Sequence, residues 1–594
     1  MSALGLMKTK LFIDIETDGL DPTRVWCIVV DDGDTVTKFT PDKVDQFPRW
    51  LENQDDYFIV GHNILEFDVP VLNRLLGITI KTEECYDTLV LSRLGDPVRS
   101  GGHSLEAWGN TLGYPKIKHE DWSEFSPDMM DRCARDVEIT KQVYENLKVE
   151  LQSFTAESVR LEHDVTAIFN RMRWDGFTLD VERAHKLLCL VKAEAGVIET
   201  EVLSYFQPVT KPMATRRPRH NKDGSVSKVG LGMFTTKDMA KCKMTLDDVI
   251  GELSPVVMES FNLGSPKQVN KRLNKLGWKP TERTQSGEWF TISETNLNTI
   301  PDTAPQCVRN LSRMLMLRSR VKLIKGWLDA SYHKDNKVHG SIISTGAITH
   351  RCAHRNPNMA NIPAVSSPYG RECRSCFRPS ASDRVIVGAD ASSIQLRMLA
   401  HYMGDKDYIN AILTGDIHTY NQEAAGIATR DQAKTFIYAW LLGAGDAKIG
   451  QIVGGNAKRG RELKAKFIKN IPALAELKLR AKVAADRGYL VGLDGRRLSI
   501  KSEHYALSSY LQGGEAVVMK WAMRHVYEEI RDYQYDARFV AFIHDEWQTD
   551  THKDYADAVG SGMVRAIVTA GKHFNLRCPL NGEYKIGNTW AETH

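Results

Sequence analysis

The stretch FVAFIHDEWQ, from Phe539 to Gln548, places Asp545 directly after a run of strand-forming residues. A second stretch, VIVGADASSIQLR from Val385 to Arg397, does the same with Asp390. Because β-branched and aromatic residues favour strands, each aspartate is predicted in or beside a turn at a strand end. Two such carboxylates brought together repel one another unless cations lie between them, which favours a two-metal site for phosphoryl transfer. Taken alone, either aspartate fits an ordinary strand-end turn.

Between these aspartates lies the segment RDQAKTFIYAWLLGAG, which is predicted to be a helix. Three of its residues fall at i, i+4 and i+8 and therefore share one face, namely Arg430, Lys434 and Tyr438. The two cations suit a triphosphate, and the ring suits a base and sugar beside it. The preceding GDIHT adds a further phosphate donor in His418. A solvated helix face is the alternative for this stripe.

The first 150 residues contain a second set of carboxylates. In LFIDIETDGL, Asp14 and Glu16 are two apart on a predicted strand and hence on one face. The segment GHNILEFDVPVL adds Asp68, and RCARDVEIT adds Asp136 at the start of a predicted helix. Each acid alone fits a surface residue or a cap. Together, the four carboxylates indicate a metal-dependent nuclease site.

The order of the motifs resembles that of family A DNA polymerases, and it extends over nearly the whole chain. The motifs that carry this resemblance are ITHRCAHRNPNMANIPAVSSPYG, DASSIQLR, GDIHT, RDQAKTFIYAWLLGAG, LDGRR, QGGEA, IHDE and the final NTWAETH. Within the family, the chain is most similar to the replicative enzymes of T-seven-type bacteriophages. The N-terminal carboxylates resemble those of the DEDD exonucleases, and HSLEAWGNTLGY resembles the phage exonuclease domain.

The resemblance implies an α/β multidomain fold, with an RNase H-like 3′–5′ exonuclease domain followed by a right-hand polymerase of thumb, palm and fingers. The expected domains are the exonuclease at 1–155, the thumb at 156–335 with a basic insert at 207–264, the first part of the palm at 336–403, the fingers at 404–505 and the second part of the palm at 506–594.

The resemblance also implies roles for single residues in a DNA-directed DNA polymerase that acts on primer-template DNA and dNTPs. Two Mg²⁺ ions are expected on Asp390, Asp545 and the Ala391 carbonyl, and two more on the exonuclease carboxylates Asp14, Glu16, Asp68 and Asp136. Glu546 and Lys434 join the expected catalytic set. The remaining expected contacts are Arg430, Lys434, Tyr438, His418 and Gln395 for the nucleotide, and Arg351, Gln512 and His544 for the primer-template.

Several positions depart from the family pattern. Arg132 and Asp131 stand where relatives place a tyrosine or histidine that orients the attacking water. Gln395 replaces the glutamate that excludes a ribose 2′-hydroxyl. Other replacements are Leu442 for a tyrosine, Ala439 for a glycine and His350 for the glycine before Arg351. None of these changes removes an expected metal ligand, so polymerisation is expected to survive while sugar selection or fidelity shifts.

Composition agrees with this interpretation without requiring it. The chain has 594 residues, a net charge of +3 and 42% hydrophobic residues, which is enough for several cores. DNA binding is therefore expected from basic patches rather than from an overall positive field. The ten cysteines are scattered, which favours reduced thiols. We find no signal peptide or membrane-spanning run, which predicts a soluble protein in the cytoplasm of a bacterial host.

The middle of the chain is predicted to form long helices that are interrupted by residues 207–264. The first part of this insert is rich in prolines, glycines and cations, and it is predicted to be a mobile basic loop. Its cations are Lys211, Arg216, Arg217, Arg219, Lys222 and Lys228. The position of the insert resembles that of the segment with which the phage enzymes bind a thioredoxin-like processivity factor and a helicase-primase. A plain flexible loop is the alternative.

Two other functions compete with a phage replicative polymerase. One is a bacterial repair polymerase of the polymerase I type, which would lack the basic insert. The other is a nuclease or DNA-binding scaffold whose polymerase half is inactive. The complete set of Asp390, Asp545, Lys434 and Arg430 argues against this scaffold.

Overall fold

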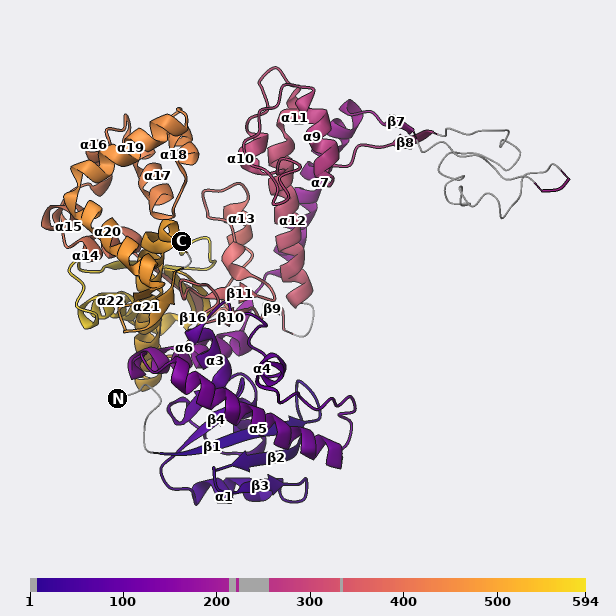
Figure 1. Ribbon diagram of the computed structural model, residues 1–594, viewed down its shortest axis with the longest axis vertical. Coiled ribbons are helices and arrows are strands. Elements are labelled where there is room, and N and C mark those ends of the chain that lie inside the picture. Colours follow the sequence, from indigo (N-terminus) through magenta and orange to yellow (C-terminus); the bar gives the residue numbers. More distant parts are fainter. Residues whose placement is uncertain (1–7, 213–220, 224–255, 332–334, 501) are drawn as a thin grey trace. The chain divides into compact units, whose positions relative to one another are not determined.

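The computed structural model describes residues 8–212, 221–223, 256–331, 335–500 and 502–594. The chain forms two compact units (Figure 1). The first contains residues 1–181 and 327–594, and the second contains residues 182–326. Each unit is described below by itself. The α/β multidomain class that the motifs predicted is confirmed.

The N-terminal part of the first unit is built on a five-stranded sheet of order β3-β2-β1-β4-β5. Its strands are β1 (Thr9–Thr17), β2 (Val25–Asp31), β3 (Val36–Phe39), β4 (Tyr57–Gly61) and β5 (Cys85–Asp87). The central strand β1 runs antiparallel to β2 and parallel to β4. Separate hydrophobic clusters cover the two faces of the sheet. This mixed topology is the RNase H-like fold, and it holds β1 rigidly between buried neighbours.

Helices pack around this sheet, and their ends follow ordinary capping rules. They are α1 (Phe47–Glu52), α2 (Asp68–Leu76), α3 (Thr88–Gly95), α4 (Leu105–Leu112) and α5 (Pro127–Glu150). In α5, the Ser126 side chain accepts a hydrogen bond from the Met129 amide, and Pro127 takes the first helical position. The prediction that Asp136 starts this helix is wrong, because the cap at Ser126 begins it more than two turns earlier.

The C-terminal part of the first unit contains a four-stranded antiparallel sheet of order β15-β16-β12-β17. The strands are β12 (Arg384–Ala391), β15 (Ala537–Ile543), β16 (Glu546–His552) and β17 (Gly582–Gly587). The helices α14 (Ile394–Met403), α21 (Glu503–Asp532) and α22 (Ala556–His573) share its hydrophobic core. The remaining elements near this sheet are α6 (Ala156–Asp175), β6 (Phe177–Thr178), β9 (Lys337–Val338), β10 (Ser341–Ile343), β11 (Ala353–Arg355) and α13 (Gly370–Arg374).

A set of helices follows α14 and joins the same core. They are α15 (Lys406–Leu413), α16 (Ile417–Ala425), α17 (Arg430–Leu441), α18 (Asp446–Ile452), α19 (Ala457–Asn470) and α20 (Pro472–Arg487), with the hairpin β13 (Tyr489–Val491) and β14 (Arg497–Ser499) after them. The predicted helix over residues 430–445 is confirmed up to Leu441. It ends there because the chain turns at Gly443, whose φ of 79° suits glycine.

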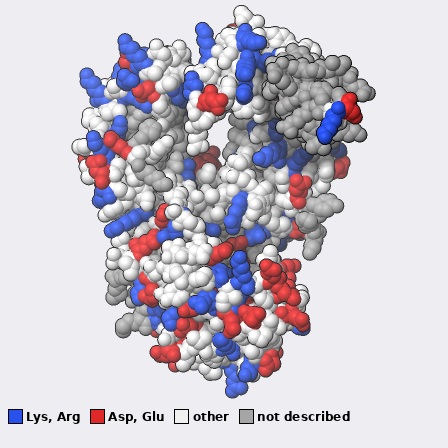
Figure 2. All heavy atoms as spheres, turned by 45° about the vertical axis from the view of Figure 1, so that its right-hand side comes forward, with Lys and Arg blue, Asp and Glu red and all other residues white. Residues whose placement is uncertain are grey.

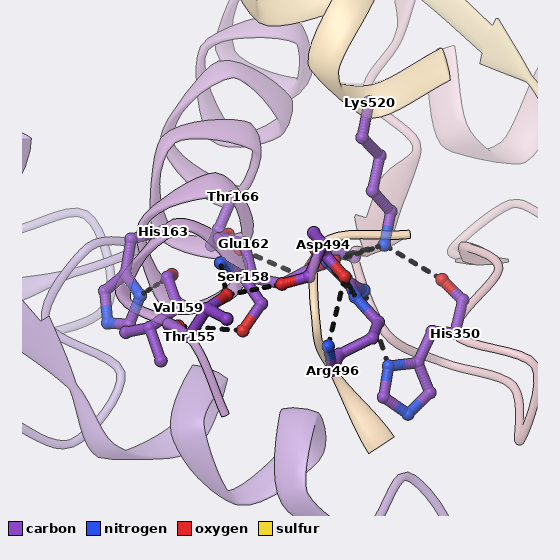
Figure 3. Close-up of polar contacts among 11 residues, drawn as sticks. Thr155, Ser158, Val159, Glu162, His163, Thr166, His350, Asp494, Arg496 and Lys520 are labelled. Carbon is purple, nitrogen blue, oxygen red and sulfur yellow. Dashed lines mark hydrogen bonds and ion pairs between the residues drawn. The ribbon is translucent and has the colours of Figure 1, made fainter. Parts of the chain in front are cut away.

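A buried ion cluster ties these segments together (Figure 3). Glu162 of α6 accepts hydrogen bonds from Arg496 (2.6 Å) and from Lys520 of α21 (2.8 and 3.0 Å). Arg496 also donates to Asp494 at 2.7–3.0 Å. The side chains of Glu162, Arg496 and Lys520 are 0% exposed, so each charge depends on the others for compensation.

The second unit consists of helices and a short strand pair. Its helices are α7 (Val181–Tyr205), α9 (Pro266–Asn274), α10 (Glu294–Leu297), α11 (Gln306–Arg309) and α12 (Leu311–Ser331), of which α12 continues into the first unit. Helix α9 begins after Ser265, whose side chain accepts a hydrogen bond from the Gln268 amide, and Pro266 takes the first helical position.

Two short strands form at the ends of the insert at 207–264, for the first part of which the sequence predicted a mobile basic loop. There β7 (Val209–Pro212) and β8 (Val256–Glu259) pair as antiparallel strands. The sequence analysis did not predict these strands, because four residues are too few to show a clear alternation of apolar and polar side chains. The predicted basic loop between them lies for the most part outside the described residues.

Charged side chains of both signs are interspersed over the face drawn in Figure 2. This pattern agrees with a net charge of only +3. Within the described ranges, we find no helix that combines the length and the apolar character needed to cross a bilayer.

Candidate active sites

The two aspartates that were predicted from separate strands lie together at one end of the C-terminal sheet. Asp390 is the penultimate residue of β12 and pairs with Glu546 across the sheet. Asp545 lies in the turn between β15 and β16. The Ala391 amide donates a hydrogen bond to the Asp545 carbonyl oxygen over 3.0 Å. This backbone contact fixes the turn beside the end of β12.

The electrostatics of this carboxylate pair favour cation binding. Partial burial, together with the charges of Asp545 and Glu546, raises the pKa of Asp390 to about 7. Burial also raises the pKa of Asp545. Among the described residues, neither carboxylate forms an ion pair. Hard carboxylate oxygens under mutual repulsion, with the Ala391 carbonyl beside them, are the donor type that Mg²⁺ prefers.

Glu546 is held differently from the two aspartates. Its carboxylate accepts hydrogen bonds from Arg374 (3.0 Å), Trp590 (2.5 Å) and Gln548 (2.8 Å), and it lies 3.0 Å from His594 Nδ1. Burial alone would raise the pKa of Glu546, but the His594 hydrogen bond and the Arg374 charge outweigh it and lower the pKa to about 2. Because its oxygens are engaged, Glu546 supports the turn at Asp545 rather than offering a free ligand.

The predicted phosphate-binding face lies on α17 as expected. Arg430 and Lys434 are exposed, and Arg430 forms a two-point ion pair with Asp416 at 2.5 and 3.2 Å. Lys434 has no ion-pair partner among the described residues. His418 of α16 lies with its ring centroid 6.2 Å from that of Tyr438. Burial lowers the pKa of His418, and the charges of Arg430 and Lys434 lower it further. The four predicted residues are thus brought together.

Tyr438 connects this helix face to the carboxylate pair. Burial raises the pKa of its hydroxyl, a hydrogen bond with the Ser393 side chain lowers it, and the charges of Asp545 and Asp390 raise it again. Gln395 instead hydrogen-bonds to Glu515 of α21. The Gln395 amide and the Tyr438 hydroxyl therefore have separate partners, and Ser393 is a contact that the sequence analysis missed.

Arg351 is fixed by a buried acid. Its Nη2 donates to both oxygens of Glu515 at 2.6 and 2.5 Å, and Glu515 is 1% exposed. Burial raises the pKa of Glu515 to about 7 in spite of the Arg351 charge, and Asp545 adds to the increase. Nearby, burial lowers the pKa of His544, whose Nδ1 has no hydrogen-bond partner among the described residues. Gln512 lies on α21 one turn before Glu515 and is half-buried.

His350 occupies a backbone conformation that explains why relatives use glycine there. Its φ is 58°, in the left-handed region, and its side chain is 0% exposed. The ion cluster of Figure 3 compensates for this strain. Lys520 donates to the His350 carbonyl oxygen over 2.9 Å, and the ring nitrogen Nδ1 lies 3.4 Å from Arg496. The cluster thereby fixes the residue that precedes Arg351.

The exonuclease carboxylates gather around the end of β1. Ligand atoms of Asp14, Glu16 and Asp136 lie within 4.8 Å of one another, and Asp68 is close enough to raise the pKa of Asp14. All four line a cavity of about 630 Å³. Burial raises the pKa of Glu16 and of Asp68 to about 7. One oxygen of Asp136 is buried without a hydrogen-bond partner among the described residues, so this oxygen is suited to coordinate a cation.

Two cationic side chains enter this second site. Lys116 Nζ lies 2.6 Å from Asp136 Oδ2, and Arg132 Nε lies 3.0 Å from Glu16 Oε1. Arg132 also donates to the Ile117 carbonyl oxygen over 2.9 Å, which fixes its side chain. Lys116 was missed by the sequence analysis, because it lies in an irregular segment between α4 and α5 that matches no motif.

The comparisons with known proteins identify the family of the chain. A profile described as DNA polymerase family A matches residues 235–592. The DNA-directed DNA polymerase of Enterobacteria phage T3 is 33% identical, over 90% of this chain and 92% of its own length. The DNA-directed DNA polymerase of Escherichia phage T7 is 31% identical, over 98% of this chain and 99% of its own length. The fold is shared with a solved structure, the POL domain of Pol1 from M. smegmatis in complex with DNA primer-template and dNTP. The TM-score is 0.76 at 17% identity, and the match covers 99% of this chain and 97% of that chain. The chain belongs to DNA polymerase family A.

Proposed function

We propose that this family A polymerase replicates phage DNA by two-metal nucleotidyl transfer at Asp390 and Asp545, and that it proofreads 3′ ends at Asp14, Glu16, Asp68 and Asp136. The observation that carries the proposal is the meeting of Asp390 and Asp545 beside Tyr438 and the cations of α17. The proposed division into domains keeps the boundaries predicted from the motifs.

In this proposal, Asp390, Asp545 and the Ala391 carbonyl hold two Mg²⁺ ions. Bound Mg²⁺ lowers the pKa of a metal-bound hydroxyl and stabilises charge on the transferred phosphate. The residues fit such ions because their oxygens are hard donors, and because burial and the charges of Asp545 and Glu546 raise the pKa of Asp390, which a bound cation would offset. At the second site, the same argument rests on Asp14, Glu16, Asp136 and the unsatisfied oxygen of Asp136.

The chain's own side chains supply positioning and charge neutralisation. Lys434, which has no ion-pair partner among the described residues, neutralises charge on the triphosphate. Arg430 gives up one of its two hydrogen bonds to Asp416 and donates to a phosphate oxygen instead. His418 adds a neutral donor, because its lowered pKa keeps the ring uncharged near pH 7. Glu515 orients Arg351 toward the primer end. Phosphoryl transfer depends mainly on such positioning and electrostatics.

The exonuclease proposal is tested by changing Asp14 and Glu16 to alanine together. We expect 3′ digestion of a mispaired primer to fall at least about a thousandfold, because loss of two ligands removes several kcal/mol of metal-derived stabilisation. Extension of a matched primer should continue at the wild-type rate. Both activities are measured on the same 5′-labelled primer. A parallel loss of extension would contradict the two-site proposal.

Tyr438 provides a test of how α17 faces the sugar. A tyrosine hydroxyl can take the place of a missing nucleotide 3′-hydroxyl, so we expect dideoxynucleotides to be incorporated almost as well as normal ones. Tyr438→Phe should lower their relative incorporation at least tenfold, because one polar contact is worth about 1–3 kcal/mol. The measurement is competition between dideoxy- and deoxynucleotides. Gln395→Glu is measured beside it as a third protein, because Gln395 is itself an expected nucleotide contact and its side chain contacts Glu515 rather than Tyr438. Rejection of dideoxynucleotides by all proteins would contradict this placement.

The insert at 207–264 is proposed to bind a thioredoxin-like processivity factor and a helicase-primase. Its deletion should leave single additions near normal and shorten the product made per binding event. Added thioredoxin should lengthen products of the intact chain only. Equal product lengths for the two proteins, across salt concentrations and with these partners present, would identify the segment as a plain loop. The cytoplasm of a bacterial host, as the site of this activity, remains a proposal from the likeness to phage enzymes.

A further inference from the structure

A second cavity of about 930 Å³ lies beside the exonuclease carboxylates and holds an excess of cationic side chains. It is lined by three acids, Glu66, Glu106 and Glu120, and by five cations, Arg93, Lys116, Lys118, Arg132 and Arg355. Lys116 and Arg132 point to the carboxylates of the neighbouring site. Arg93 and Arg355 have no such role and need a separate explanation.

Arg93 and Arg355 reach the cavity from different parts of the first unit. Arg93 belongs to α3, next to the RNase H-like sheet, and Arg355 ends β11. Within the described residues, neither guanidinium has an ion-pair or hydrogen-bond partner. Burial lowers the pKa of Arg93, and the positive charge of Arg355 is the next largest cause. The two guanidinium groups are therefore close enough to repel each other.

The nearest acids, Asp87 and Glu66, relieve this repulsion only in part, because the pKa of Arg93 stays lowered and neither carboxylate forms an ion pair with Arg93 among the described residues. Asp87 caps α3, and its carboxylate accepts hydrogen bonds from the backbone amides of Asn63 (2.9 Å), Leu65 (3.1 Å) and Leu89 (2.9 Å). Glu66 is paired with Arg173. Two guanidinium groups that line one cavity, with no ion-pair partner among the described residues, are suited to bind an anion, and planar donors of this kind match phosphate oxygens best.

The cavity is continuous in its lining with the exonuclease site. The residues that line both cavities are His62, Asn63, Glu66, Lys116 and Arg132. A strand whose 3′ end lies at Asp14 and Asp136 therefore passes Lys116 before it reaches Arg93. The volume is that of a small-ligand pocket, which has room for a few nucleotides of a single strand and not for a duplex.

We infer that Arg93 and Arg355 together bind an internucleotide phosphate of a single DNA strand whose 3′ end occupies the exonuclease site. This inference rests on the exonuclease activity proposed above. The path of the strand then runs along the junction between α3 and β11. Arg355 lies four residues after Arg351 and contacts the strand when the 3′ end of that strand is in the exonuclease site rather than in the polymerase site.

The first test measures digestion of a short single-stranded oligonucleotide by the full chain with Mg²⁺. Arg93→Gln and Arg355→Gln should each lower kcat/KM about tenfold, chiefly through KM, because each removes charge-assisted hydrogen bonds to phosphate. Arg93→Lys and Arg355→Lys should recover part of the loss. Arg49→Gln, a change of the same kind on an exposed residue of α1 outside the cavity, should have no effect. Thermal unfolding of every variant reports whether its fold is intact.

A set of oligonucleotides with one uncharged methylphosphonate linkage locates the phosphate. In the wild-type chain, one position near the 3′ end should weaken digestion about tenfold. In the double Arg93→Gln, Arg355→Gln variant, the same linkage should have less than about a twofold effect, since the contact is already lost. Equal sensitivity of the two proteins at every position would overturn the inference.

Binding separates this inference from the exonuclease proposal. With Asp14 and Glu16 changed to alanine, the chain cannot digest, and its affinity for the same oligonucleotides is measured by fluorescence anisotropy. The slope of log affinity against log salt should shrink by about 0.7 when both arginines are replaced, because one phosphate contact is lost. If the wild-type chain digests nothing but the slope still changes, the exonuclease proposal fails and the phosphate site stands. If digestion occurs and neither slope nor KM changes, the phosphate site is wrong.

Discussion

Asp545→Asn is expected to lower nucleotide addition at least about a thousandfold while leaving primer-template binding within about twofold of wild type. The reason is that Asp545 lies in the turn that the Ala391 amide fixes beside Asp390. Asparagine keeps the size of the side chain and removes the charge, so the loss falls on metal binding. About 4 kcal/mol of metal-derived stabilisation corresponds to this factor.

The measurement is single-turnover extension of a labelled primer over a titration of Mg²⁺, with the affinity for primer-template measured in parallel. Asp390→Asn should behave in the same way. Asp554→Asn is the control, because this aspartate follows the same sheet and its side chain is 79% exposed. Extension by Asp545→Asn within tenfold of wild type at saturating Mg²⁺ would contradict the assignment of this carboxylate as a ligand.

Glu162→Gln is expected to destabilise the first unit by about 3–5 kcal/mol, because it leaves Lys520 buried without a counter-charge and Arg496 with Asp494 as its remaining ion-pair partner. The free energy of unfolding is measured by urea denaturation. Glu145→Gln is the matched control, since Glu145 also lies on a helix of this unit but pairs with Lys148 at the surface over 3.3 Å. Surface pairs contribute about 0–1 kcal/mol. A loss as small as that of the control would show that the cluster is not needed for stability.

The same variant has a defined pH dependence. Burial alone would raise the pKa of Glu162, but Lys520 and Arg496 lower it to about 2. Because the folded-state pKa lies below that of the unfolded chain, the stabilisation is complete above about pH 4.5 and is lost as the pH falls toward 2. The difference in unfolding free energy between wild type and Glu162→Gln should therefore narrow on acidification from pH 6 to pH 3.

Much of the fold and both carboxylate sets could be predicted from the sequence because their signals are local. Asp390 and Asp545 follow strand-forming runs, and Arg430, Lys434 and Tyr438 repeat at helical spacing. The family resemblance supplied the order in which such local pieces assemble, and the comparisons confirmed the family.

Contacts between distant segments could not be predicted in this way. Lys116 has no periodic pattern around it, so only the folded chain brings its ammonium group to Asp136. Glu515 belongs to the QGGEA motif, but its role depends on Arg351, which is 164 residues away in sequence. Ser393 becomes a partner of Tyr438 only when the sheet and α17 meet. Side-chain pairs of this kind carry no signal in one sequence without related sequences to compare.

The ion cluster around Glu162 also sets an order of events during synthesis. Glu162 lies 358 residues before Lys520, so roughly 20–70 s separate their appearance at a ribosome that adds about 5–20 residues per second. Until Arg496 emerges, 334 residues after Glu162, no cation of the cluster is present to accompany Glu162 into a core. Burying an unpaired carboxylate costs several kcal/mol. The side of α6 that carries Glu162 is therefore expected to stay exposed to solvent after the RNase H-like sheet before it has been synthesised. The nascent chain therefore folds its N-terminal sheet first and docks α6 only after α21 has emerged.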